Sequence, residues 1–265
     1  MLHRPLRTPA RKRATVTPGA LTVPAYVAAI AGAEIVVARV GVVPGLLCDA
    51  LILLALLDHY AWQRLAPYRR ALPVLALAPL LRILSLAMPI AAVPRLYWYV
   101  LIGLPLWAGV FLASRLLDFT WAGLGLGHSP WRPQLLIALS GPPLSLAAYL
   151  LVRPRPLISV FDGPHLLVGA IILTFFAACT EEVLFRGLLQ HVLTDIFPRS
   201  GVLWSASLFA SMYIGSLSVR YVLFMGLVGL FFGWCVRQTG SLWGVILAHS
   251  GLIVGLVCVW PFHHP

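Results

Sequence analysis

Long apolar segments recur along this chain of 265 residues, and each is about as long as a lipid bilayer is thick. A helix needs ~20 mostly apolar residues to cross a bilayer. Hydrophobic residues make up 60% of the chain and charged residues only 10%, which is too little polar material to cover a soluble domain of this size. The sequence therefore predicts an all-α, multi-pass membrane protein.

Nine segments are predicted as spans, and the first of them is the weakest. Glu34 and Arg39 interrupt it, so an interfacial or re-entrant helix is the alternative for this segment, and the bundle has about eight spans. The predicted spans are 21–41, 43–62, 71–93, 96–117, 134–152, 165–192, 201–218, 220–237 and 241–260. In the eighth, Gly229 and Gly233 lie four residues apart, a spacing that lets neighbouring helices approach closely.

The chain is interpreted as one membrane domain with three parts. Residues 1–20 are predicted to be a basic cytoplasmic tail, residues 21–152 to be N-terminal spans, and residues 165–260 to be the functional core. The basic tail precedes an apolar run as in a signal peptide, but that run leads directly into further spans, so a retained anchor is favoured. We find no internal repeat and no soluble appendage long enough to fold alone.

The net charge of +11 comes from arginines scattered between the apolar segments rather than gathered on one face. Such residues flank helices, set topology and meet anionic lipids, so the predicted partners are membrane lipids and not nucleic acid. The tail, with Arg64, Arg69 and Arg70 after the second span, predicts a cytoplasmic N-terminus.

The segment CTEEVLFRG, residues 179–187, places ionisable groups inside a predicted span, where they are costly and usually functional. Glu182 and Arg186 are four residues apart and share a helix face, so we expect them to pair. Glu181 points about 100° away from Glu182 and stays free to take a proton. A Glu–Arg pair can be purely structural, but that interpretation leaves Glu181 without a local partner.

Two further polar residues lie within predicted spans near the C-terminus. His249 is in the middle of the last span, and Tyr213 follows the acidic pair by one helix. A lone histidine of this kind is often a core residue with its hydrogen bonds satisfied, and a tyrosine is more often there for packing. Both are candidate site residues because polar groups inside spans are by default functional-site candidates.

These residues together resemble the CPBP family of intramembrane proteases, which includes the CAAX prenyl endopeptidases and the bacterial abortive-infection proteins. Glu181, Glu182 and Arg186 match its first motif, Glu-Glu-x-x-x-Arg. Phe209–Tyr213 matches the second, Phe-x-x-x-His, only in part, because Tyr213 replaces the histidine. His249 matches the third, but Ile253 stands where the family has asparagine.

The resemblance implies a helical core around an intramembrane polar cavity and an endopeptidase that cuts a membrane-anchored protein or peptide. Glu181 would activate water, Glu182 and Arg186 would hold the geometry, and His249 and Tyr213 would stabilise the oxyanion. A tyrosine hydroxyl, with a pKa of about 10 in its ordinary state, can donate to an oxyanion but is a poor base near neutrality. The resemblance also implies C-terminal processing or sorting in a bacterial inner (plasma) membrane.

Metal-free hydrolysis is favoured, with no cofactor, because zinc catalysis uses about three protein ligands and the second family histidine is absent. A zinc ion remains an alternative. Two rival hypotheses stay open: a catalytically weak or inactive relative that binds a membrane partner, and a small transporter. A transporter predicts repeated halves, which the sequence lacks.

Overall fold

The computed structural model describes residues 21–62, 66, 68–88 and 92–263, and within these ranges the chain is helical with no β-strand. The predicted tail at residues 1–20 and Arg64 lie outside the described residues. The α-helices are α1 (Thr22–Arg39), α2 (Val42–Trp62), α3 (Leu72–Leu75), α4 (Leu77–Ala87), α5 (Arg95–Leu116), α6 (Trp131–Ala138), α7 (Gly141–Val152), α8 (Gly163–Leu173), α9 (Thr180–Glu182), α10 (Gln190–Ile196), α11 (Gly201–Ser211), α12 (Val219–Thr239), α13 (Trp243–Val254) and α14 (Trp260–His263).

Eight continuous helical stretches of the described chain are long and apolar enough to cross a membrane. The all-α, multi-pass prediction is therefore confirmed. Two details differ from the sequence-based expectation. The doubtful first span is a continuous helix, α1, whereas the predicted span 201–218 is broken into the short helix α11, which ends at Ser211, and a 3₁₀ turn at Ile214–Ser216.

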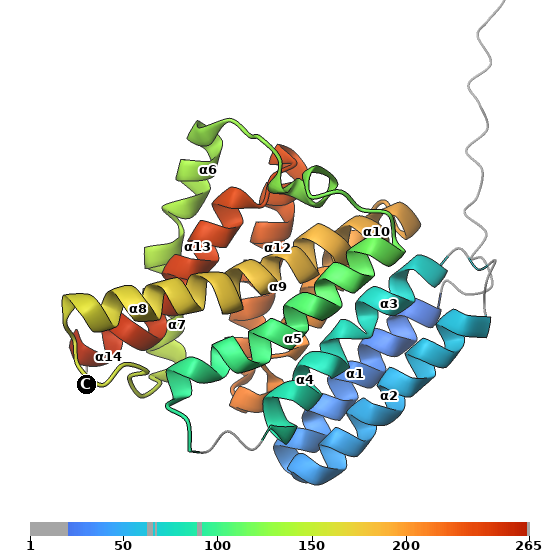
Figure 1. The fold of residues 1–265 in the computed structure, drawn as a ribbon, viewed down its shortest axis with the longest axis horizontal. Coiled ribbons are helices and arrows are strands. Elements are labelled where there is room, and N and C mark those ends of the chain that lie inside the picture. The colour runs from blue at the N-terminus through green and yellow to red at the C-terminus, as the bar shows by residue number, and fades with distance from the viewer. Residues whose placement is uncertain (1–20, 63–65, 67, 89–91, 264–265) are drawn as a thin grey trace, which may run out of the picture.

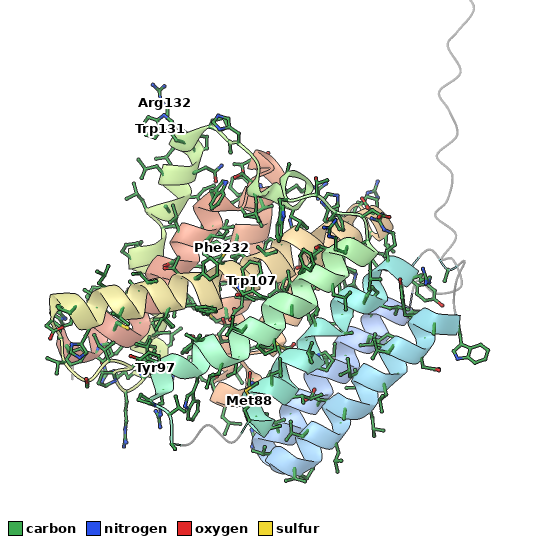
Figure 2. The ribbon with its side chains drawn as sticks, viewed as in Figure 1. Met88, Tyr97, Trp107, Trp131, Arg132 and Phe232 are labelled. Atoms are coloured by element: carbon green, nitrogen blue, oxygen red, sulfur yellow. The ribbon has the colours of Figure 1, made fainter. Side chains whose placement is uncertain are left out.

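The outward faces of the helices are apolar, as a lipid-facing surface requires. On α2, the side chains of Leu47, Leu51 and Leu54 are more than 60% exposed. A soluble monomer rarely exposes apolar residues contiguously over such a face. Figure 2 shows side chains projecting all round the bundle, with Trp131 and Arg132 extending from the end of α6.

One long helix, Gly163–Ile196, passes through the middle of the molecule and includes α8, α9 and α10 (Figure 1). Asp162 caps the N-terminus of this helix, and its carboxylate accepts a hydrogen bond from the backbone N–H of His165 at 2.9 Å. This bond and the one from the His165 side chain hold the pKa of Asp162 below its usual range. α5 packs beside the long helix, and α1 and α2 form a hairpin at one edge.

The pair of glycines on α12 forms the close contact that its spacing predicts. A Cβ atom added at Gly229 would lie 3.2 Å from Phe209 and 3.3 Å from Ala206, both on α11. Gly233 faces Val202 of α11 and Gln190 of the long helix, whose amide donates a 2.9 Å hydrogen bond to the Gly233 carbonyl. The two glycines thus let α11, α12 and the long helix meet closely.

Candidate active site

The long helix is irregular where it carries the two glutamates. π-helical turns occupy Thr174–Cys179 and Val183–Leu189, and the three residues of α9, Thr180–Glu182, lie between them. π-helical turns are rare and are often found at functional sites. Each π turn contains one more residue than an α-helical turn, so the residues beyond it are rotated about the axis relative to a regular α-helix.

Glu182 and Arg186 form the ion pair that their spacing predicts. Nη1 of Arg186 donates to Oε1 of Glu182 at 3.0 Å, and both side chains are buried. The guanidinium carbon lies 4.2 Å from the ring centroid of Phe209, and Nη2 is 3.5 Å from the carbonyl oxygen of Gly229. Arg186 is thus fixed by a carboxylate, an aromatic face and a backbone carbonyl, and the sequence predicted only the first of these contacts.

His249 of α13 lies between the two glutamates. Its Nδ1 atom is 2.7 Å from Oε1 of Glu182, and its Nε2 atom is 3.9 Å from Oε2 of Glu181. Because the carboxylate of Glu182 only accepts, the imidazole donates to it through Nδ1–H, which directs Nε2 towards Glu181. Nε2 is buried and has no hydrogen-bond partner among the described residues.

Glu181 is the glutamate that reaches an internal cavity. About a quarter of its side chain is exposed, whereas Glu182 has no exposed surface. The cavity has a volume of about 190 Å³ and lies between α4, α5, the long helix and the C-terminal end of α11. Its lining residues are Leu81, Arg82, Ser85, Tyr99, Ile102, Leu106, Phe176, Ala177, Glu181, Phe185, Met212 and Tyr213.

Tyr213 lines the same cavity, and its hydroxyl lies close enough to interact with the carboxylate of Glu181. Its ring is held edge-on against Phe209 and Tyr221, with centroids 5.3 and 5.6 Å away. Phe209 also packs edge-on against His249 at 5.8 Å, so one phenylalanine contacts the tyrosine, the histidine and Arg186. Three of the five candidate residues therefore pack against Phe209, and the two glutamates lie beside His249.

Ile253 is half-buried one turn after His249 and is not among the described residues that line the cavity. It supplies no polar atom. Nearby, the hydroxyls of Thr174 and Ser250 are hydrogen-bonded and join the long helix to α13. Neither hydroxyl belongs to a sequence motif that identifies it.

Three further polar residues of the cavity wall, Arg82, Ser85 and Tyr99, were not identified from the sequence. Arg82 carried a usable signal, because it is the one ionisable residue within the predicted span 71–93. Its partner is Glu34 of α1, with which it forms an ion pair. This pair explains how α1 keeps a glutamate within a span.

The donor set does not fit a zinc site. In the described part of the chain, no three histidine, cysteine, aspartate or glutamate side chains are grouped so that they could hold a metal ion. Oε1 of Glu182 is engaged by Arg186 and His249, and its Oε2 atom is buried and does not line the cavity. Glu181 and one imidazole nitrogen are then the donors nearest the cavity, where a catalytic zinc takes about three protein ligands.

The fold and the site together define a multi-pass, all-helical membrane protein with a carboxylate and a histidine beside an internal cavity. Residues 163–254 match the family model of the Rce1-like type II CAAX prenyl endopeptidases. This match confirms the resemblance drawn from the motifs: the segment from α8 to α13 is similar to the Rce1-like endopeptidases, which is consistent with a member of the CPBP family of intramembrane proteases. Searches among curated proteins and solved structures found no match.

Proposed function

We propose that this protein is an intramembrane endopeptidase that hydrolyses a peptide bond in a membrane-anchored protein or peptide. The observation that carries this proposal is the position of Glu181, which lies on the cavity wall with Nε2 of His249 behind it at 3.9 Å. Glu182 and Arg186 fix the imidazole from the other side. The family match to proteases supports the same reaction class.

In this mechanism Glu181 accepts a proton from a water molecule in the cavity as the water oxygen bonds to the scissile carbonyl carbon. The carbonyl π electrons move to oxygen and form the tetrahedral oxyanion. On collapse the C–N bond breaks, and the proton held by Glu181 passes to the leaving amine. A positioned general base of this kind contributes about 10²–10⁴-fold to the rate.

The roles of His249 and Tyr213 follow from their positions. The sequence-based hypothesis was that both residues stabilise the oxyanion. The hydroxyl of Tyr213 faces the cavity and can donate to that oxygen. The buried Nε2 of His249 instead supports a role as proton partner of Glu181, because it lies 3.9 Å from that carboxylate and has no other hydrogen-bond partner among the described residues.

The test is cleavage of membrane-anchored reporter peptides, including a prenylated C-terminal peptide, by the purified protein in proteoliposomes. Fragments would be identified by mass spectrometry. We expect Glu181→Gln to reduce cleavage by at least about 10²-fold. Cleavage that persists in this variant would refute the protease proposal, and Arg220→Gln, an exposed site on α12, serves as the control.

A second candidate is a weak or inactive relative that binds a membrane partner, and it is favoured by Tyr213 and Ile253 at two family positions. It predicts peptide binding without cleavage in both the wild-type protein and Glu181→Gln. A small transporter ranks below it. For cellular context, we propose C-terminal processing or sorting in a bacterial inner membrane, with a cytoplasmic N-terminus and membrane lipids as partners.

A further inference from the structure

Arg82 is the one cation among the described residues that line the cavity. It lies on α4, outside the segment matched by the family model, and faces the space into which Glu181 and Tyr213 also project. A charged side chain within a span is costly, so such residues usually face the bundle interior or a water-filled cavity and take part in function. Arg82 has both the cavity and a carboxylate partner.

The guanidinium of Arg82 is anchored but not saturated. Nη2 donates to Oε2 of the fully buried Glu34, while Nε is buried without a hydrogen-bond partner in the described structure. A guanidinium has five N–H donors. Glu34 therefore holds the cation in place through one of them and leaves donors available to a group in the cavity. Asp49 of α2 lies near this pair but is fully buried and does not line the cavity.

The proposed reaction needs a hydrogen-bond donor to the oxyanion inside the cavity. An oxyanion forms on the scissile carbonyl inside the cavity, and removal of a single donor from an oxyanion hole typically costs 10²–10³-fold in rate. Ile253 has no polar atom to offer, and neither it nor His249 is among the described residues that line the cavity. Tyr213 and Tyr99 supply neutral hydroxyls, but neither supplies positive charge.

We infer that Arg82 is a catalytic residue that binds the oxyanion of the tetrahedral intermediate, with Glu34 as its positioning residue. The inference rests on the proposed hydrolase function. Arg82 lies on the Tyr213 side of the cavity, because a Cβ atom added at Gly215, two residues after Tyr213, would be 3.5 Å from its Nη2 atom. The base and the proposed oxyanion donor thus come from different helices around one space.

The test compares binding of two peptides of the same sequence to the protein in proteoliposomes. One carries a phosphonate in place of the scissile amide, which mimics the charged tetrahedral intermediate, and the other carries an uncleavable ketomethylene group. We expect Arg82→Gln to weaken phosphonate binding by about 10²–10³-fold and to leave ketomethylene binding unchanged. Equal weakening of both, or of neither, would overturn the inference.

Two further variants separate catalysis from folding. Arg82→Gln leaves Glu34 buried without its cation, so the double variant Glu34→Gln/Arg82→Gln restores a neutral, hydrogen-bonded pair. We expect it to unfold at the wild-type temperature and still to lose phosphonate binding; retention of that binding would overturn the inference. Arg220→Gln removes an exposed arginine and should change neither affinity.

If the proposed protease function is wrong, the cleavage and binding results differ from those expected if only the role of Arg82 is wrong. If the protein is no protease, Glu181→Gln leaves any processing unchanged, and the wild-type protein binds the phosphonate no more tightly than the ketomethylene peptide. If it is a protease without the Arg82 role, the wild-type protein prefers the phosphonate and Arg82→Gln keeps that preference.

Discussion

The Nδ1 atom of His249 lies 2.7 Å from Oε1 of Glu182, the same oxygen that accepts the hydrogen bond of Arg186 at 3.0 Å. One buried carboxylate oxygen therefore orients both the histidine and the arginine. This relationship gives the two adjacent glutamates different tasks. Glu182 is the internal anchor, and Glu181, on the cavity wall, is free for chemistry.

Loss of the anchor should destabilise the fold. Glu182→Ala leaves the guanidinium of Arg186 buried without its counter-charge, and breaking a buried pair in this way costs about 3–5 kcal/mol. We expect a clear fall in Tm, measured by thermal unfolding in detergent. Glu182→Gln is the matched control, because it keeps an acceptor and should lose less. Equal Tm values for the two variants would contradict the anchoring role.

Tyr213→Phe should lower activity without changing stability. The ring contacts with Phe209 and Tyr221 remain, while the hydroxyl next to Glu181 is lost. We expect kcat to fall by about 10²–10³-fold, as for removal of an oxyanion donor, with KM and Tm near their wild-type values. Steady-state cleavage of a reporter peptide measures this, and an unchanged kcat would limit Tyr213 to packing.

The glycines of α12 should differ in how well they tolerate substitution by alanine, because their neighbours lie at different distances. A Cβ atom added at Gly233 would lie 2.8 Å from Val202, whereas one at Gly226 would meet Ala210 at an ordinary 3.5 Å. Overpacking typically costs about 1–3 kcal/mol, so Gly233→Ala should lower Tm. Gly226→Ala on the same helix should not. A similar Tm for both variants would show that α12 can shift to relieve the contact.

Activity should survive strong chelators. The available donors are Glu181 and one imidazole nitrogen, fewer than a catalytic zinc requires. We expect reporter cleavage to continue after treatment with 1,10-phenanthroline and dialysis. If activity disappears and zinc restores it, a metal-independent role for Glu181 is wrong.

Much of this arrangement follows from the sequence, because the bilayer limits what an apolar chain can form. Span length identifies the helices, and the spacing of Glu182 and Arg186 identifies their pairing. The position of His249 between the glutamates depends on how α13 packs against the long helix, which no local pattern specifies. The sequence-based hypothesis therefore named His249 but not the atom that faces each glutamate.

The ion pair between Glu34 and Arg82 likewise could not be predicted from local sequence patterns. Glu34 weakened the prediction for its own span, because a sequence shows a charged residue in isolation. Its partner Arg82 is 48 residues later, and only the packing of α1 and α4 brings them together. The predicted division into residues 21–152 and 165–260 remains untested, but the cavity takes residues from both segments.

The π-helical turns on either side of α9 have a consequence for how this chain tolerates length changes. Each residue of a helix advances by about 100°, so a deletion that converted one of these turns into regular α-helix would rotate everything beyond it by that angle. A deletion in residues 187–189 would leave Glu181, Glu182 and Arg186 in place but turn Gln190 away from Gly233 of α12. Two chains with the same Glu-Glu-x-x-x-Arg motif would then differ in how the helices pack beside it through a single missing residue.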